Sequence, residues 1–182
     1  MFITQRNMDL KEFIRSIPDY PKKGILFRDI TTLIKDDKAF AECVDQIVEK
    51  SKNFKFDKIA AIESRGFVFA SAVSYILKKP FIMLRKKNKL PAEVHSVDFK
   101  LEYGTATIEV HKDSIDRGEK VLIIDDLIAT GGTAEAAAKL VEISKGEVAG
   151  FIFVINLFDL GGSDNLIKDK YKVENLINFP GH

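Results

Sequence analysis

The sequence predicts an α/β protein whose central sheet is mostly parallel and flanked by helices. Apolar runs with the length of strands alternate with helical segments from residue 58 to residue 157, an order typical of βαβ units. The run at 148–157 is nearly continuous in apolar residues, which favours burial on both faces of a parallel sheet. With 182 residues and a hydrophobic content of 46%, the chain is suited to one domain, residues 1–182, with a sizeable core.

The composition excludes several classes of protein. The 28 basic and 27 acidic residues give a formal net charge of +1, which argues against a general nucleic-acid partner. Cys43 is the only cysteine, so no intrachain disulfide or cysteine metal cluster can form, and the chain suits a reducing compartment. Residues 1–10 lack the pattern of a signal peptide, and no stretch approaches the roughly 20 apolar residues of a membrane helix. We therefore expect a soluble cytoplasmic protein with no membrane partner.

Two helices and an extended stretch are expected before the sheet begins. Apolar residues at 10, 13, 14 and 17 repeat at helical spacing, and Pro18 and Pro21 end that helix. Residues 24–32 are irregular or extended. The segment Asp37–Ser51 has the periodicity of an amphipathic helix.

Strands and helices then alternate along the rest of the chain. Strands are predicted at Lys58–Ile62, 80–84, 105–110, 120–124 and 148–157. Helices are predicted at 67–77 and 134–144. Residues 85–103 are polar, poorly periodic and too long for an ordinary connection, so we expect a functional flap there.

Three polar segments follow predicted strands, at 63–66, 125–133 and 157–159. Ligands of parallel α/β sheets bind outside the carboxyl ends of the strands. We therefore expect these three segments to converge in space and to form a ligand site.

The most informative motif is Asp125-Asp126-Leu127-Ile128-Ala129-Thr130-Gly131-Gly132-Thr133. Its small residues and the helix that follows present backbone N–H groups to an anion, and its two carboxylates suit hydroxyl groups or a metal ion. An ordinary βα turn with capping aspartates is the plainer interpretation, but the pair of acids beside the Gly/Thr turn disfavours it. The lysine of a P-loop is absent, because Thr133 and Ala134 follow the glycines. A phosphorylated sugar fits this combination.

Cations follow two other strands. Arg65 lies in Glu63-Ser64-Arg65-Gly66-Phe67, and the run Arg85-Lys86-Lys87-Asn88-Lys89 begins the flap. Alone, each would be an exposed turn or a solvated basic loop. Beside a phosphate site, however, arginine supplies a planar group with several donors. A flap with cations at its base and Glu102 near its end suits a lid over a polyanion.

Together these motifs resemble the type I phosphoribosyltransferases. Residues 125–133 are similar to that family's motif for phosphoribosyl pyrophosphate (PRPP). Residues 27–29 and the flap segments 85–91 and 101–104 resemble the branch of the family that uses adenine, and 156–162 and 179–182 resemble its bacterial members. The resemblance covers residue 17 to the end. It implies the type I phosphoribosyltransferase fold, with a small N-terminal hood of about residues 1–35 and a long flexible flap at about 86–104.

The resemblance implies the reaction of adenine with PRPP to give AMP and pyrophosphate, with Mg²⁺ as cofactor and a homodimer as the usual assembly. The 5′-phosphate would be held by Ala129, Thr130, Gly131, Gly132 and Thr133. Asp125 and Asp126 would lie beside the ribose hydroxyls and metal-bound waters, and no residue is expected to bind the metal directly. The pyrophosphate would be bound by Ser64, Arg65, Arg85 and Lys89. The family often holds this loop in a strained and sometimes cis non-proline peptide, so a cis bond between Glu63 and Ser64 is our hypothesis.

For the base, the resemblance implies contacts of Leu26 and Arg28 through backbone groups, with the ring between Phe27 and Leu157. Arg65 and Glu102 would be the catalytic residues. Chemistry supports these roles: pyrophosphate leaves easily only when its charge is neutralised, and uncharged adenine must lose a proton, for which Glu102 is placed as the acid or base. A backbone carbonyl that accepts from the 6-amino group would reject a 6-oxo purine.

Other interpretations stay open on the residues alone. Phe27 and Leu157 would each pass for core residues, and Glu102 for a surface residue at a strand edge. A transferase for 6-oxopurines is the second enzymatic hypothesis, although no lysine-bearing strand end for a 6-oxo group is found at Leu157. A non-catalytic regulator that binds PRPP is a third, which retention of Arg65 and Glu102 disfavours. Asn88 departs from the glycine usual in the family and is expected to stiffen the flap.

Overall fold

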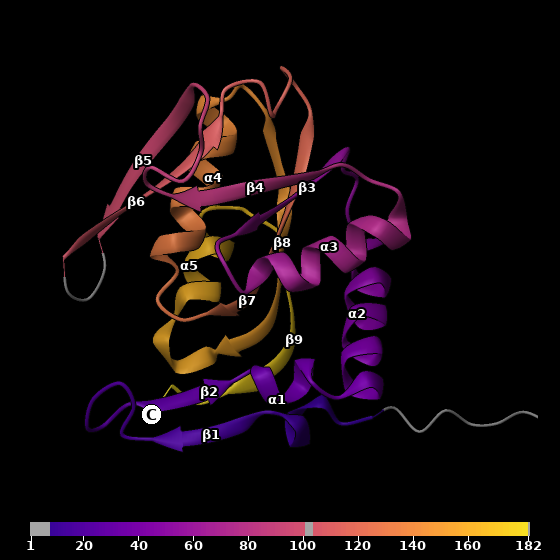
Figure 1. Ribbon diagram of the computed structural model, residues 1–182, viewed down its shortest axis with the longest axis vertical. Helices are drawn as coiled ribbons and strands as arrows, with labels where there is room; N and C mark the ends of the chain where they lie inside the picture. The colour runs from indigo at the N-terminus through magenta and orange to yellow at the C-terminus, as the bar shows by residue number, and fades with distance from the viewer. Residues whose placement is uncertain (1–7, 101–103, 182) are drawn as a thin grey trace, which may run out of the picture.

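The computed structural model describes residues 8–100 and 104–181. The strands of its main sheet are β3 (Lys58–Ile62), β4 (Phe81–Lys86), β5 (Val94–Lys100), β6 (Thr105–His111), β7 (Lys120–Ile128), β8 (Glu147–Leu157) and β9 (Val173–Phe179). They lie in the order β5-β6-β4-β3-β7-β8-β9 (Figure 1). The five strands from β4 to β9 in this order are parallel, whereas β6 pairs antiparallel with β4 and β5 with β6. The predicted mostly parallel sheet is confirmed.

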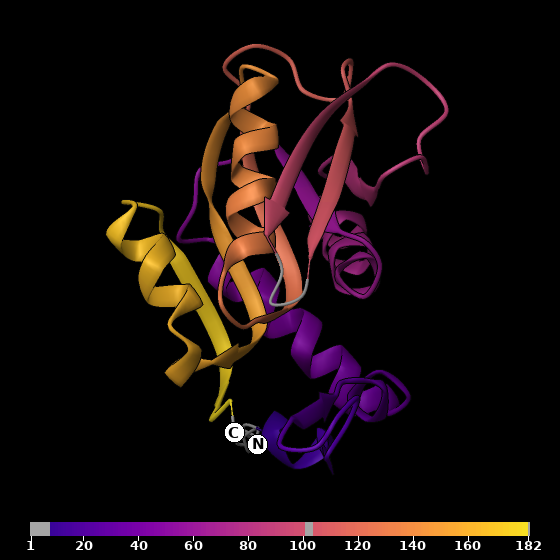
Figure 2. The ribbon, with the colours of Figure 1, turned by 90° about the vertical axis from the view of Figure 1, so that its left-hand side faces the viewer.

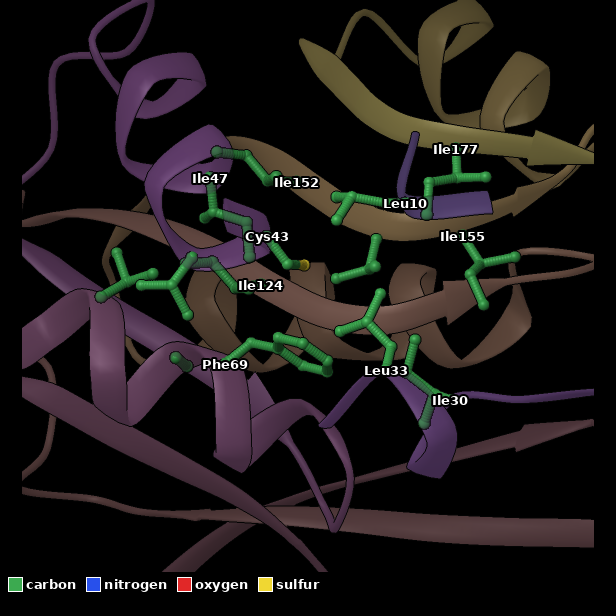
Figure 3. Close-up of a cluster of buried hydrophobic side chains, with 14 of the residues drawn as sticks. Leu10, Ile30, Leu33, Cys43, Ile47, Phe69, Ile124, Ile152, Ile155 and Ile177 are labelled. Carbon is green, nitrogen blue, oxygen red and sulfur yellow. The ribbon is translucent and has the colours of Figure 1, made fainter. Parts of the chain in front are cut away.

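Helices cover both faces of this sheet, as Figure 2 shows from the side. One face carries α2 (Asp37–Ser51) and α3 (Gly66–Leu77), and the other carries α4 (Gly132–Ile143) and α5 (Gly162–Lys168). Side chains of β7 alternate between the two cores: Leu122 and Ile124 pack toward α2 and α3, while Ile123 packs toward the alanines of α4. The first core includes Cys43, Phe69 and other side chains drawn in Figure 3.

The N-terminal residues form a separate small sheet, which we call the hood (residues 8–35). It contains η1 (Leu10–Phe13), the antiparallel pair β1 (Arg15–Pro18) and β2 (Leu26–Asp29), and α1 (Thr31–Ile34). The helix predicted over residues 10–17 is therefore wrong beyond its first turn. Ile17 pairs with Phe27 in the strand ladder, and Pro18 restricts Ile17 to extended backbone. The hood lies across the carboxyl edge of the main sheet, next to the end of the chain (Figure 1).

The remaining differences concern lengths and the C-terminal part. Strand β7 continues to Ile128 instead of ending at Ile124, because Asp125 and Leu127 still pair with β8. The segment predicted as a polar flap contains β5, which forms a hairpin with β6 alongside α4 (Figure 2). Sequence reasoning assigned neither α5 nor β9. In the described part of the chain, no helix is long and apolar enough to cross a membrane.

Candidate active site

A cavity of about 250 Å³ lies at the carboxyl edge of the sheet, where β3 and β7 end. Ser64 and Arg65 line one side of it. The other side consists of residues 125–134, from the end of β7 into the first turn of α4. Two of the three segments expected to converge are thus brought together. Leu157, from the third, ends the neighbouring strand β8 but does not line this cavity.

The loop between β7 and α4 has the geometry of an anion site. Gly131 has a φ of +95°, which an L side chain adopts only with strain, and α4 begins at the next residue. No side chain caps this helix. Its first-turn amides therefore lack the intrahelical partner that later amides have, and they carry the positive end of the helix dipole. Thr130 and Thr133 line the cavity beside these amides and add hydroxyl donors.

Two buried carboxylates flank this loop. Asp125 and Asp126 expose only 9% and 6% of their surface. The Asp126 N–H donates to Asp125 Oδ1 at 2.9 Å, and Arg65 Nε lies 2.9 Å from Asp126 Oδ2. Burial, and then the neighbouring carboxylate of Asp126, raise the pKa of Asp125 well above its usual range. Burial also raises the pKa of Asp126, and the Arg65 guanidinium opposes that rise. Such oxygens can accept hydrogen bonds from hydroxyls or bind a hard cation.

Arg65 links this pair of acids to the hood. Its side chain keeps 43% of its surface exposed and lines the cavity. The guanidinium carbon lies 5.8 Å from the centre of the Phe27 ring, on β2. Phe27 also meets Tyr20 edge to face, with ring centres 5.2 Å apart. The structure thus brings a residue predicted to hold the base next to one predicted to hold pyrophosphate.

The loop that carries Arg65 contains the expected cis peptide, between Glu63 and Ser64. Glu63 Oε2 accepts from the Lys86 N–H at 2.9 Å and from Arg85 Nε at 3.2 Å. Burial alone would raise the pKa of Glu63, but the Lys86 amide and the Arg85 guanidinium outweigh it and the pKa is lowered. Arg85 also donates to the Lys89 carbonyl at 3.3 Å. Arg85 therefore joins this loop to the base of the flap, although neither it nor Lys89 lines the cavity.

The residues expected at the base lie on the hood and at the end of β8. Leu26 and Phe27 are half-buried, and Arg28 is buried. The Arg28 side chain donates to Ser16 Oγ at 2.5 Å and to the Pro180 carbonyl at 3.1 Å, and its guanidinium lies over the Phe179 ring. The terminal nitrogens of Arg28 are therefore engaged with the hood and the C-terminal tail, whereas its Nε is buried and finds no hydrogen-bond partner among the described residues.

The sequence analysis singled out two flap residues, Glu102 and Asn88, and the structure describes only the second. Glu102 lies outside the residues that the structure describes. Asn88 has a φ of +64°, the left-handed region where glycine is favoured and asparagine is the best-tolerated alternative. Its N–H donates to the buried Glu109 at 3.0 Å.

Gly66 is a site residue to which sequence reasoning gave no role. A Cβ built on it would lie 2.6 Å from Asp125 Oδ1 and 3.2 Å from the Ile124 carbonyl oxygen. Only glycine allows the start of α3 to approach the Asp125 carboxylate so closely. The one available signal was a glycine directly after the arginine of a strand-to-helix turn.

The family described as phosphoribosyl transferase domain matches residues 31–180. That match covers most of the chain, including the cavity, both loops and the sheet. The chain therefore belongs to the phosphoribosyltransferase family.

Within this family it groups with the adenine phosphoribosyltransferases. It is 81% identical to the adenine phosphoribosyltransferase of Pelagibacter ubique, over 96% of this chain and 100% of the relative. The crystal structure of the enzyme from Thermoanaerobacter pseudethanolicus is 48% identical, with a TM-score of 0.89 over 93% of this chain and 98% of that one. The Saccharomyces cerevisiae enzyme, complexed with an imino-altritol bisphosphate and adenine, is 34% identical, with a TM-score of 0.86 over 96% and 100% of the two chains. The type I phosphoribosyltransferase fold is confirmed.

Proposed function

We propose that this chain transfers the 5-phosphoribosyl group of PRPP to adenine, which yields AMP and pyrophosphate and salvages the purine. One observation carries the proposal: a single cavity joins the uncapped start of α4, two buried aspartates and Arg65. These groups match a phosphate, a diol and a leaving polyanion. The high identity to an adenine phosphoribosyltransferase supports adenine as the acceptor.

The sugar phosphate is bound by the loop and the aspartates. Ala129, Thr130, Gly131, Gly132 and Thr133 hold the 5′-phosphate through backbone N–H groups and hydroxyls. Asp125 and Asp126 accept hydrogen bonds from the ribose hydroxyls. Their position between the loop and Arg65 supports this assignment, because the ribose joins the 5′-phosphate to the pyrophosphate.

The pyrophosphate is bound on the other side of the cavity, by Ser64, Arg65, Arg85 and Lys89. Arg65 is the catalytic cation, since its guanidinium neutralises charge that develops on the leaving group. The donor set fits Mg²⁺ held mainly by PRPP and water: the two aspartates offer hard oxygens, and the described residues contain no group of three or more potential metal ligands. When bound, Mg²⁺ adds to the neutralisation of the pyrophosphate.

The base lies between the hood and the end of β8. Phe27 and Leu157 hold the adenine ring, and Leu26 and Arg28 recognise its edge through backbone groups. The engagement of the Arg28 side chain with Ser16 and the tail supports a backbone role. Glu102, outside the described residues, donates or accepts the proton that adenine exchanges on forming the bond to ribose.

A base panel tests this function. The protein is incubated with PRPP and Mg²⁺ and, separately, adenine, hypoxanthine or guanine, and nucleotide is measured by chromatography. We expect AMP from adenine and at least 100-fold less product from either 6-oxopurine, because a carbonyl left unpaired in the base site discriminates strongly. Product mainly from hypoxanthine or guanine would establish the 6-oxopurine alternative. PRPP binding without any nucleotide would establish a non-catalytic regulator.

We also infer that two copies of the chain associate through the outer face of α3. We place this dimer in the cytoplasm. Val68, Tyr75 and Ile76 expose 36%, 75% and 46% of their surface on this helix, and the neighbouring strand β4 adds Met83 at 46%. An apolar surface of this kind is typical of an interface. Tyr75→Asp is expected to convert dimer to monomer in sedimentation velocity, whereas Ile167→Asp, at a similarly exposed residue on α5, is expected to leave the dimer intact. A wild-type monomer would contradict the inference.

A further inference from the structure

The turn between β8 and α5 contacts the backbone of residues 129–131, in the loop proposed to hold the 5′-phosphate. It consists of η2 (Phe158–Leu160) and Gly161, after which α5 begins at Gly162. The Gly162 N–H donates to the Ala129 carbonyl at 3.0 Å. Gly162 does not itself line the cavity, whereas Ala129 does. The Gly162 end of the contact therefore lies outside the lining of the cavity.

The contact is between two backbones and leaves no room for a side chain. A Cβ built on Gly162 would lie 2.4 Å from the Ala129 carbonyl oxygen, 2.6 Å from the Gly131 nitrogen and 2.8 Å from the Thr130 carbonyl carbon. All three are main-chain atoms, which no rotamer change can move. A Cβ on Gly131 would in turn lie 3.2 Å from the Gly162 Cα. Any side chain at 162 must displace the loop or the start of α5.

We propose that Gly162 is a positioning residue for the 5′-phosphate of PRPP; this rests on the proposed function of the loop. Its N–H fixes the direction of the Ala129 carbonyl. Because the peptide between Ala129 and Thr130 is trans, the Thr130 N–H then points to the opposite side, away from α5. A donor aimed in advance at an anion needs no rearrangement on binding.

The test is Gly162→Ala, measured by calorimetry with ribose 5-phosphate and, separately, magnesium pyrophosphate. We expect the Kd for ribose 5-phosphate to rise about 10- to 100-fold, since small misplacements of binding groups have large effects. The Kd for pyrophosphate should change less than threefold, because the atoms nearest to a Cβ on Gly162 belong to residues 129–131 and not to the Arg65 loop. In turnover assays the KM for PRPP should rise more than kcat falls. A merely structural role would weaken both ligands together, and this result would overturn the proposal.

Gly161→Asn is the matched control. Gly161 has a φ of +75°, which asparagine tolerates, and a Cβ there meets nothing within 4 Å. We expect wild-type binding of both ligands. A milder second variant, Ser163→Ala, removes the hydrogen bond from Asn175 Nδ2 to Ser163 Oγ, 3.0 Å long, that ties the start of α5 to β9. It should weaken ribose 5-phosphate about two- to fivefold, which tests the proposal even where Gly162→Ala does not fold.

Unchanged ribose 5-phosphate binding in folded Gly162→Ala would refute the positioning role. Failure of the wild-type protein to bind ribose 5-phosphate would instead refute the function proposed for the loop. The two failures are therefore distinguished by the wild-type titration.

Discussion

Replacing Arg65 by glutamine removes the cation that lies between Asp126 and the Phe27 ring. The effect on folding is expected to be small. The Arg65 side chain is 43% exposed, so solvent screens its ion pair with the buried Asp126 and the pair contributes about 0–1 kcal/mol, while the carboxylate left behind can take up a proton instead of staying an unpaired buried charge. For a chain of this size that corresponds to a fall in Tm of no more than about 4 °C.

The effect on catalysis is expected to be much larger. Loss of one donor to developing charge costs about 2.7–4 kcal/mol in well-studied enzymes, or roughly 100- to 1000-fold in kcat. The pH dependence should also change. Arg65 lowers the pKa of Asp126 against the effect of burial, so its removal raises that pKa further. If the ionised pair binds PRPP, the acidic limb of kcat/KM moves to higher pH in Arg65→Gln.

The assay is steady-state AMP formation at saturating adenine with varied PRPP, from pH 5 to 9, with Tm measured on the same samples. Arg117→Gln, an exposed arginine in the turn before β7, is the matched control and should behave as wild type. A kcat for Arg65→Gln within threefold of wild type would refute the role assigned to Arg65. An acidic limb of kcat/KM at the same pH as in the wild-type protein would also refute that role.

Two further predictions concern the hood and the flap. The Thr31 hydroxyl, and then Arg15, hold the pKa of the buried Asp29 at about 2, below its ordinary value of 3.8. This stabilisation is present above about pH 4 and is lost as the pH falls toward 2. Asp29→Asn should therefore lower Tm by several degrees at pH 7, consistent with about 1.5–3 kcal/mol for hydrogen bonds to a charged group, and should make the free energy of unfolding less dependent on pH below about 4. An unchanged Tm at pH 7 would contradict this prediction. Glu102→Gln should lower kcat at least 100-fold, in line with acid–base catalysis, with less than threefold change in the Kd for PRPP, and unchanged turnover would exclude the acid–base role.

The parts of the fold that local patterns dictate were predictable from the sequence. The helix Asp37–Ser51 and the strand Lys58–Ile62 have the predicted bounds, because their periodicity and their burial agree. The segment 10–17 was not predictable in this way. Its apolar spacing is helical, but pairing with β2, some ten residues further on, holds the part from Arg15 onward extended. Such pairing is a tertiary effect that a local window cannot contain.

The residues of the candidate site were predictable from the sequence where their role depends on the charge or hydrogen-bonding groups of the side chain. Asp125, Asp126 and Arg65 were singled out for charge, and the structure places them within hydrogen-bonding range of their neighbours. The supports of the site were not predictable. Gly66 and Gly162 act through the absence of a side chain, and the atoms that they approach belong to segments about 60 and 30 residues away. Only the assembled fold shows why glycine is needed there.

The most direct test of the account is a crystal structure of the protein with AMP. We expect the phosphate at the start of α4, within hydrogen-bonding distance of the backbone N–H groups of residues 130–133. We expect the ribose hydroxyls beside Asp125 and Asp126, and the adenine ring between Phe27 and Leu157. A nucleotide phosphate bound away from this loop, with the cavity empty, would contradict the account.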